Sequence, residues 1–102
     1  MPESKRKSPR VQIHLVVQIE AEGASARALA VNVGLGGMFI AGWPLAYGQL
    51  VHIVAQLPGL AEPARLPAIV RWANGEGYGV QFLQLGAQVT HALSQLVSQA
   101  AA

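Results

Sequence analysis

The sequence is divided into short apolar segments that alternate every second residue and are separated by turn-forming residues. Between positions 11 and 19 every odd position is apolar, whereas most even positions are polar. A period of two places the apolar side chains on one face of a β-strand. Further segments of this kind occupy residues 27–33, 38–40, 50–57, 66–72 and 78–82. The pattern predicts six short strands joined by turns, as in a small antiparallel barrel.

The end of the chain has a different period. Apolar residues recur there at intervals of three and four, at Val89, Leu93, Leu96, Val97 and Ala100. This spacing predicts an amphipathic helix. The expected fold is therefore all-β, a six-stranded antiparallel barrel with a C-terminal α-helix. The apolar stripe of the helix either covers the barrel or contributes to a dimer contact, so a monomer or a weak homodimer is expected.

Composition limits both the size and the location of the protein. A chain of 102 residues with 52% hydrophobic and 12% charged residues suits one domain with a modest core. We expect a flexible arm over residues 1–10 and a single domain over residues 11–102. No apolar run approaches the roughly 20 residues that span a bilayer, and the N-terminus lacks the apolar stretch of a signal peptide. A cytoplasmic protein without a membrane span is expected.

The chain is poor in catalytic residues. It contains neither cysteine nor aspartate, and His14, His52 and His91 lack the spacing of common zinc motifs. Glu20 and Glu22 share one face of a strand end, but a solvated edge is the better interpretation. No catalytic residue, metal site or resident cofactor is therefore predicted, and a binding module is favoured over an enzyme.

Positive charge is concentrated at the N-terminus. Residues 1–10 carry four basic residues and one acidic residue, a net charge of +3, whereas residues 11–102 carry three basic and four acidic residues, a net charge of −1. Such an arm favours an anionic partner, although it also suits a solvated tail that keeps the domain soluble. Pro9 favours an extended chain. Arg6 and Arg10 then project to the same side, roughly 13 Å apart at about 3.3 Å per residue, and each can grip a phosphate or a guanine edge bidentately.

Two further features are candidates for ligand binding. Residues 32–37, Asn-Val-Gly-Leu-Gly-Gly, interrupt the strand pattern. Glycines there permit positive φ and close approach of a ligand, and successive N–H groups can form an anion-binding nest, although such a break is often only a turn or a bulge. Trp72 lies at a strand end, where its ring is expected to be half exposed and able to stack on a base. Most of the other aromatic residues are expected in the core.

The combination of these motifs resembles the PilZ domain, the bacterial receptor module for cyclic di-GMP. That family has an RxxxR motif followed by [D/N]-x-S-x-x-G, and this chain has Arg6 and Arg10 followed by an Asn32-x-Gly34-x-x-Gly37 motif. Four further segments also look like PilZ sequences in the expected order: residues 36–40, 57–58, 70–72 and 77–82.

The resemblance implies a role for each motif residue. Arg6 and Arg10 would hold guanine edges and phosphates, and Asn32 with the backbone from Gly34 to Gly37 would receive a guanine. Lys5 would lie at the rim of the site, where it would influence whether one ligand or a stacked pair binds, and Trp72 would pack against the ligand. Gly34 replaces the usual serine, so a hydrogen bond is missing and affinity is expected to fall by about tenfold.

The resemblance implies a cyclic di-GMP receptor whose arm changes conformation on binding and signals to a partner protein. The alternative is a degenerate PilZ adaptor that binds no nucleotide and acts through protein contacts in motility or pilus machinery. A barrel that binds single-stranded nucleic acid is disfavoured, because the body of the domain is slightly acidic.

Overall fold

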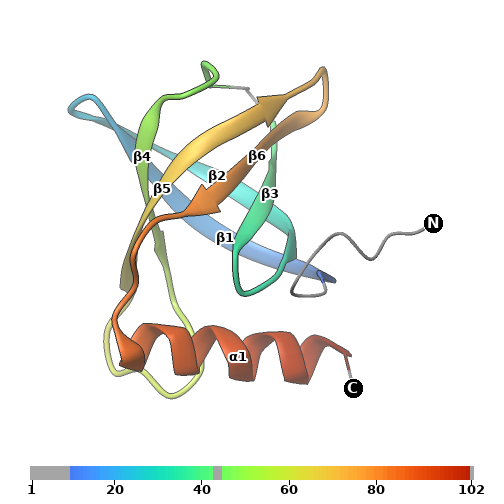
Figure 1. Ribbon diagram of the computed structural model, residues 1–102, viewed down its shortest axis with the longest axis vertical. Coiled ribbons are helices and arrows are strands. Elements are labelled where there is room, and N and C mark those ends of the chain that lie inside the picture. Colours follow the sequence, from blue (N-terminus) through green and yellow to red (C-terminus); the bar gives the residue numbers. More distant parts are fainter. Residues whose placement is uncertain (1–9, 43–44, 102) are drawn as a thin grey trace.

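The chain folds into a closed antiparallel β-barrel followed by one helix (Figure 1). In this computed structural model, residues 10–42 and 45–101 are described. The elements are β1 (Val11–Ala21), β2 (Ala24–Val33), β3 (Gly37–Ala41), β4 (Leu50–Ala55), β5 (Ala64–Ala73), β6 (Gly77–Phe82) and α1 (Ala87–Ala101). Around the barrel the order is β1-β2-β3-β6-β5-β4, and β4 pairs with β1 to close it. The predicted fold class is confirmed.

Alternation along the strands separates a core from an outer surface. In β3, Met38 and Ile40 are fully buried and face Val80 and Tyr78 of β6 across the ladder. The largest fully buried side chains are Met38, Ile40, Ile53, Leu66, Leu93, Val33, Val70 and Val80. Seven of these eight belong to the strands, and the eighth belongs to the helix. The core therefore fills the barrel and continues to the end that the helix covers.

Helix α1 lies across one end of the barrel (Figure 1). Ala92 and Leu93 are buried, and Val89, Leu96 and Val97 pack partly against the core. Ala100, which the sequence pattern placed on the apolar stripe, is exposed, whereas Ala92 is buried. The part of the stripe that packs against the barrel therefore ends at Val97, about one turn earlier than predicted. Among the described residues, no helix has the length and apolar character to cross a membrane.

Pro67 lies inside β5, where a proline is unusual because it cannot donate a hydrogen bond to the ladder. It is tolerated here because β6 is short. The ladder between β5 and β6 ends at the pair Ala68 and Phe82, and beyond it the carbonyl of Pro67 accepts a hydrogen bond from the N–H of Leu83 at 2.8 Å. A residue of an antiparallel ladder directs its N–H and C=O groups to the same neighbouring strand. The nitrogen of Pro67 therefore faces the side of β6, beyond the last pair of the ladder, where no donor is required.

Tyr47 differs from the expectation that most aromatic residues fill the core, because this residue is 72% exposed. It lies in the connection between β3 and β4, where no facing strand covers it. Phe39, Tyr78 and Phe82 are buried as expected. Trp43 lies outside the described residues.

Candidate functional site

A row of four residues crosses four neighbouring strands on the outside of the barrel. Asn32 of β2 is opposite Phe39 of β3, Phe39 is opposite Gly79 of β6, and Gly79 is opposite Trp72 of β5. Directly opposed residues of antiparallel strands share a face. The neighbours of Phe39 along β3 point into the core, so the row faces outward. We call these four residues the outer row.

Two aromatic rings of the outer row form a stacked pair. The ring centroids of Phe39 and Trp72 are 5.2 Å apart, and the ring planes are inclined by 23°. Phe39 is only 9% exposed although it faces outward, whereas Trp72 is 44% exposed. The indole therefore covers the phenyl ring and keeps part of its own surface open. This is the half-exposed position that the sequence predicted for Trp72, and an open aromatic face is what a stacked base requires.

Gly79 makes this arrangement possible. A Cβ atom at position 79 would lie 2.5 Å from Nε1 of Trp72, which is much closer than van der Waals contact. Trp72 therefore lies directly over the backbone of β6, between its own strand and Phe39. A glycine within a strand pattern indicates such a close approach, so the Tyr78-Gly79-Val80 segment contained the signal that the sequence analysis missed.

Asn32 carries a buried acceptor at the other end of the outer row. Its Oδ1 atom is buried and accepts no hydrogen bond from any described residue. A buried acceptor without a partner costs about 1–3 kcal/mol. The register of β2 against β3 also shifts between Ala30 and Asn32, and such irregularities often re-aim a side chain beside a binding site. These observations favour a ligand donor as the partner of Asn32.

The turn after Asn32 is held by backbone hydrogen bonds. The N–H of Gly34 donates to the carbonyl of Gly37 at 2.9 Å, and the N–H of Phe82 donates to the carbonyl of Gly36 at 2.8 Å. Within the described ranges, positive-φ glycines occur at Gly23, Gly42, Gly48 and Gly59, and none lies in this turn. The N–H of Gly34 is therefore used within the turn, which leaves fewer N–H groups in this segment for an anion-binding nest.

Gly37 has a structural role that is independent of any ligand. A Cβ atom at this position would overlap the carbonyl oxygen of Val80 and crowd the Cα atom of Gln81. The backbones of β3 and β6 approach each other too closely for a side chain here. Gly37 is thus required for the β3–β6 ladder.

The structure places one of the two motif arginines near Asn32. Arg10 immediately precedes β1, and β1 pairs Val11 with Val33 and Gln12 with Asn32. The start of β1 therefore lies beside the turn between β2 and β3 (Figure 1). Arg10 is partly buried at this end of the barrel. Lys5 and Arg6 lie outside the described residues, so their predicted roles remain predictions.

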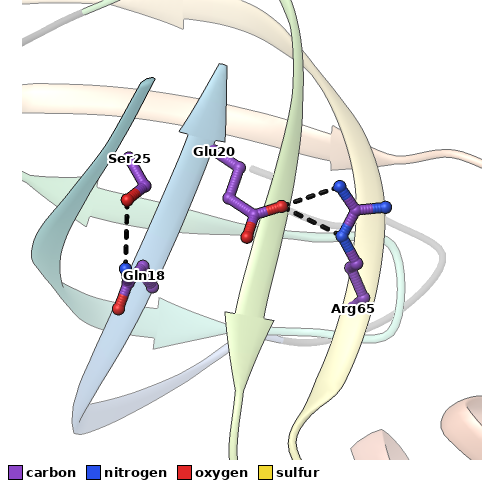
Figure 2. Close-up of polar contacts among 4 residues, drawn as sticks. All are labelled: Gln18, Glu20, Ser25 and Arg65. Atoms are coloured by element: carbon purple, nitrogen blue, oxygen red, sulfur yellow. Dashed lines mark hydrogen bonds and ion pairs between the residues drawn. The ribbon is translucent and has the colours of Figure 1, made fainter. Parts of the chain in front are cut away.

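A separate group of polar side chains lies on the outside of β1, β2 and β5 (Figure 2). The guanidinium of Arg65 donates to Oε1 of Glu20 from Nη2 at 2.7 Å and from Nε at 3.0 Å. The amide of Gln18 donates to Oγ of Ser25 at 3.1 Å. The Arg65 and Glu20 side chains are 59% and 37% exposed, so the ion pair contributes at most about 1 kcal/mol. Glu20 is thus paired with Arg65, as suits a solvated strand edge.

Across residues 10–42 and 45–101, no group of three or more His or Glu side chains is placed to hold a metal ion.

The described residues thus form a closed barrel whose outer wall carries a stacked aromatic pair and a buried acceptor without a partner. A family model for the PilZ domain matches residues 4–99, and the chain therefore belongs to the PilZ domain family. PilZ domains act as receptor and adaptor modules. A search of curated proteins found no match.

Solved structures of PilZ proteins share the fold. The PilZ domain of CeSA from a cellulose-synthesizing bacterium has a TM-score of 0.71 and 21% identity, with 90% of this chain and 97% of that chain covered. The PilZ domain of YcgR from Escherichia coli, solved with c-di-GMP, has a TM-score of 0.74 and 16% identity, with coverage of 96% and 92%. The Bacillus subtilis inhibitor of motility MotI/DgrA has a TM-score of 0.73 and 22% identity, with 97% of this chain but only 55% of that chain covered.

Proposed function

We propose that this protein is a bacterial, cytoplasmic receptor for cyclic di-GMP that signals to a partner protein and catalyses no reaction. The observation that carries the proposal is the outer row, in which the buried Oδ1 of Asn32 lacks a partner among the described residues and Trp72 offers an open ring. Guanine has both a π-face and N–H donors along its Watson–Crick edge. One purine can therefore stack on Trp72 or donate to Asn32.

The arginines complete the proposed site. An arginine fork matches O6 and N7 of guanine, and it also matches two phosphate oxygens. Arg10 lies at the end of the barrel that holds Asn32. In the proposal, Arg6 and Arg10 clamp the ligand from the arm, Lys5 lies at the rim, and the backbone of residues 34–37 borders the guanine. The ligand carries two negative charges, whereas residues 1–10 carry a net charge of +3, so binding draws the arm against the barrel. The altered surface is then presented to the partner.

Isothermal calorimetry with purified protein and cyclic di-GMP tests this function, with GMP as the control ligand. We expect saturable binding of cyclic di-GMP and much weaker binding of GMP, because GMP cannot engage both arginines and Asn32 together. The absence of binding to cyclic di-GMP at millimolar concentration would refute the proposal.

The second candidate function, an adaptor without nucleotide affinity, is favoured by one observation. Gly34 stands where the family motif has serine, so one hydroxyl donor is missing from the site. The same calorimetric titration separates the two candidates. An adaptor shows no heat of binding with cyclic di-GMP, while it retains its partner interaction.

The Asn32→Ala variant tests whether Asn32 serves the ligand or the fold. We expect the affinity for cyclic di-GMP to fall by about tenfold or more, because a hydrogen bond is lost. The free energy of unfolding without ligand should not fall, since Oδ1 has no partner to lose within the described part of the chain. Calorimetry and urea denaturation measure the two effects.

Asn74→Ala is the matched control. Oδ1 of Asn74 accepts hydrogen bonds from the N–H groups of Glu76 and Gly77 at 2.7 and 3.1 Å in the turn between β5 and β6. This variant should lose about 1 kcal/mol of stability and keep its affinity. The opposite pattern, with Asn32→Ala destabilised and still able to bind, would assign Asn32 to the fold.

The Gly34→Ser variant restores the residue of the family motif. We expect its affinity for cyclic di-GMP to rise by up to about tenfold, the value of one additional hydrogen bond. Gly36→Ser is the control, because a Cβ atom added at position 36 would have no heavy atom within 4 Å, so this position accepts the same side chain beside the site. An equal gain in both variants would show that the hydroxyl at position 34 has no specific role.

A further inference from the structure

Part of one edge of the β1–β2 hairpin pairs with no other strand in the described part of the chain. β2 pairs with β1 along its whole length, from Ala24 to Val33, but its ladder with β3 begins only at Leu29. Among the strands that the structure describes, residues 24–28 therefore have a neighbour on one side only. Figure 1 shows this hairpin projecting beyond the rest of the barrel, at the end away from α1.

The geometry of the turn determines which backbone groups face the open side. Glu22 and Gly23 have φ values of 51° and 82°, as in a two-residue hairpin turn. The residues that flank such a turn, Ala21 and Ala24, form a hydrogen-bonded pair, and the direction of the N–H and C=O groups then alternates along β2. Ser25 and Arg27 thus direct their backbone groups away from β1. Neither makes a backbone hydrogen bond outside the β1–β2 hairpin to any residue that the structure describes.

A cavity opens beside this edge. It has a volume of about 300 Å³, and the side chains that line it include Ala26 and Ala28 of β2, Ile19, Ala41, Leu45 and Tyr78. The small side chains of β2 leave space there that larger residues would fill. Tyr78, which lines the cavity, is only 3% exposed. Burial raises the pKa of the Tyr78 hydroxyl, so this group remains a neutral donor.

We propose that residues 24–28 bind an extended segment of a partner protein, which adds to β2 as a further strand. In this mode of recognition the main-chain hydrogen bonds provide affinity, and pockets for alternate side chains provide specificity. The N–H and C=O groups of Ser25 and Arg27 pair with the added strand. Alternate apolar side chains of that strand enter the cavity beside Ala26 and Ala28.

The charge at the edge favours a partner protein over a second copy of this chain. Arg27 points to the outer face of β2, and its guanidinium forms no ion pair with a described residue, since the acidic side chain nearby, Glu20, is bonded to Arg65. An acidic residue on the added strand complements Arg27. If two copies paired edge to edge, their two Arg27 side chains would lie on the same short ladder. The repulsion between these like charges disfavours self-pairing. This inference does not depend on nucleotide binding.

The test uses a capped heptapeptide of alternating glutamate and valine as the probe, followed by ¹⁵N NMR of the whole protein. We expect shifts confined to residues near β2 and the cavity, and slower hydrogen exchange of the Ser25 and Arg27 amides on binding. Arg27→Pro should weaken peptide binding by at least about tenfold, because it removes an edge donor. The barrel should tolerate this change, since that N–H is not used within it. Arg27→Ala keeps the donor and removes only the charge, so its loss should be smaller.

A second probe keeps the test decisive if Arg27→Pro does not fold. The same heptapeptide, methylated at alternate backbone nitrogens, lacks the N–H donors on the edge that would face β2. It therefore cannot pair with β2 and should not bind. Equal binding of both peptides would overturn the proposal, as would shifts centred on Trp72. A third outcome would also overturn the proposal: no peptide binding, together with concentration-dependent dimerisation that becomes stronger in Arg27→Ala. That result would identify a second copy of this chain as the occupant of the edge.

Discussion

The Gly37→Ala variant is expected to lose about 3 kcal/mol or more of its free energy of unfolding, a large share of the 5–15 kcal/mol typical of a domain. The added methyl group would overlap the carbonyl oxygen of Val80, and backbone atoms cannot rotate away as a flexible side chain can. β3 and β6 would have to separate at the point where Gly37 pairs with Gln81. Because β3 and β6 are internal to the closed barrel, this separation weakens the whole ladder. Urea denaturation followed by circular dichroism measures the loss.

Gly36→Ala is the matched control for this prediction. A Cβ atom at position 36 has nothing within 4 Å, and its φ lies outside the left-handed region. This variant should unfold within about 0.5 kcal/mol of the native protein. Equal stability of the two variants would contradict the close approach of β3 and β6.

Arg6→Ala and Arg10→Ala are each expected to weaken cyclic di-GMP binding by about 10–100-fold, because a hydrogen bond to a charged group contributes about 1.5–3 kcal/mol. Calorimetry on the two variants and on their combination gives the affinities. Unchanged affinity in both single variants would refute the proposed site.

Arg65→Ala controls for the loss of positive charge. Arg65 lies on the outside of β5 and is bonded to Glu20 (Figure 2). It is near the start of β5, whereas Trp72 of the outer row is near the end of that strand. Its removal changes the net charge by the same amount, and the affinity should fall by less than about twofold. A loss equal to that of the arm variants would indicate general electrostatic attraction in place of a specific clamp.

Most of the fold could be predicted because the alternation of apolar residues follows the barrel wall. Val17 and Ile19 are buried in β1, while Gln18 between them is exposed, as a period of two requires. Strand register was not predictable, because it depends on contacts between distant segments. The position of Pro67 illustrates this limit, since it is allowed only by the point at which β6 ends.

The candidate site was predicted in part. Asn32 was identified from a motif and Trp72 from its place at a strand end. That they lie in one row on the barrel was not predictable, because Phe39 and Gly79 on two other strands lie between them. Phe39 was assigned to the core, and it is buried, but by an indole on the outside of the barrel. The apolar run Met38-Phe39-Ile40 does not show by itself which of its side chains face outward. The register of β3 against β6 shows that Phe39 does.

The position of Trp72 also provides a spectroscopic reporter. Trp72 is 44% exposed and its indole stacks with Phe39, so its emission is sensitive to whatever covers the exposed part of the ring. A purine stacked there would quench the fluorescence, and no label would be needed to follow occupancy in real time. The chain has two tryptophans, and Trp72→Phe separates the two signals.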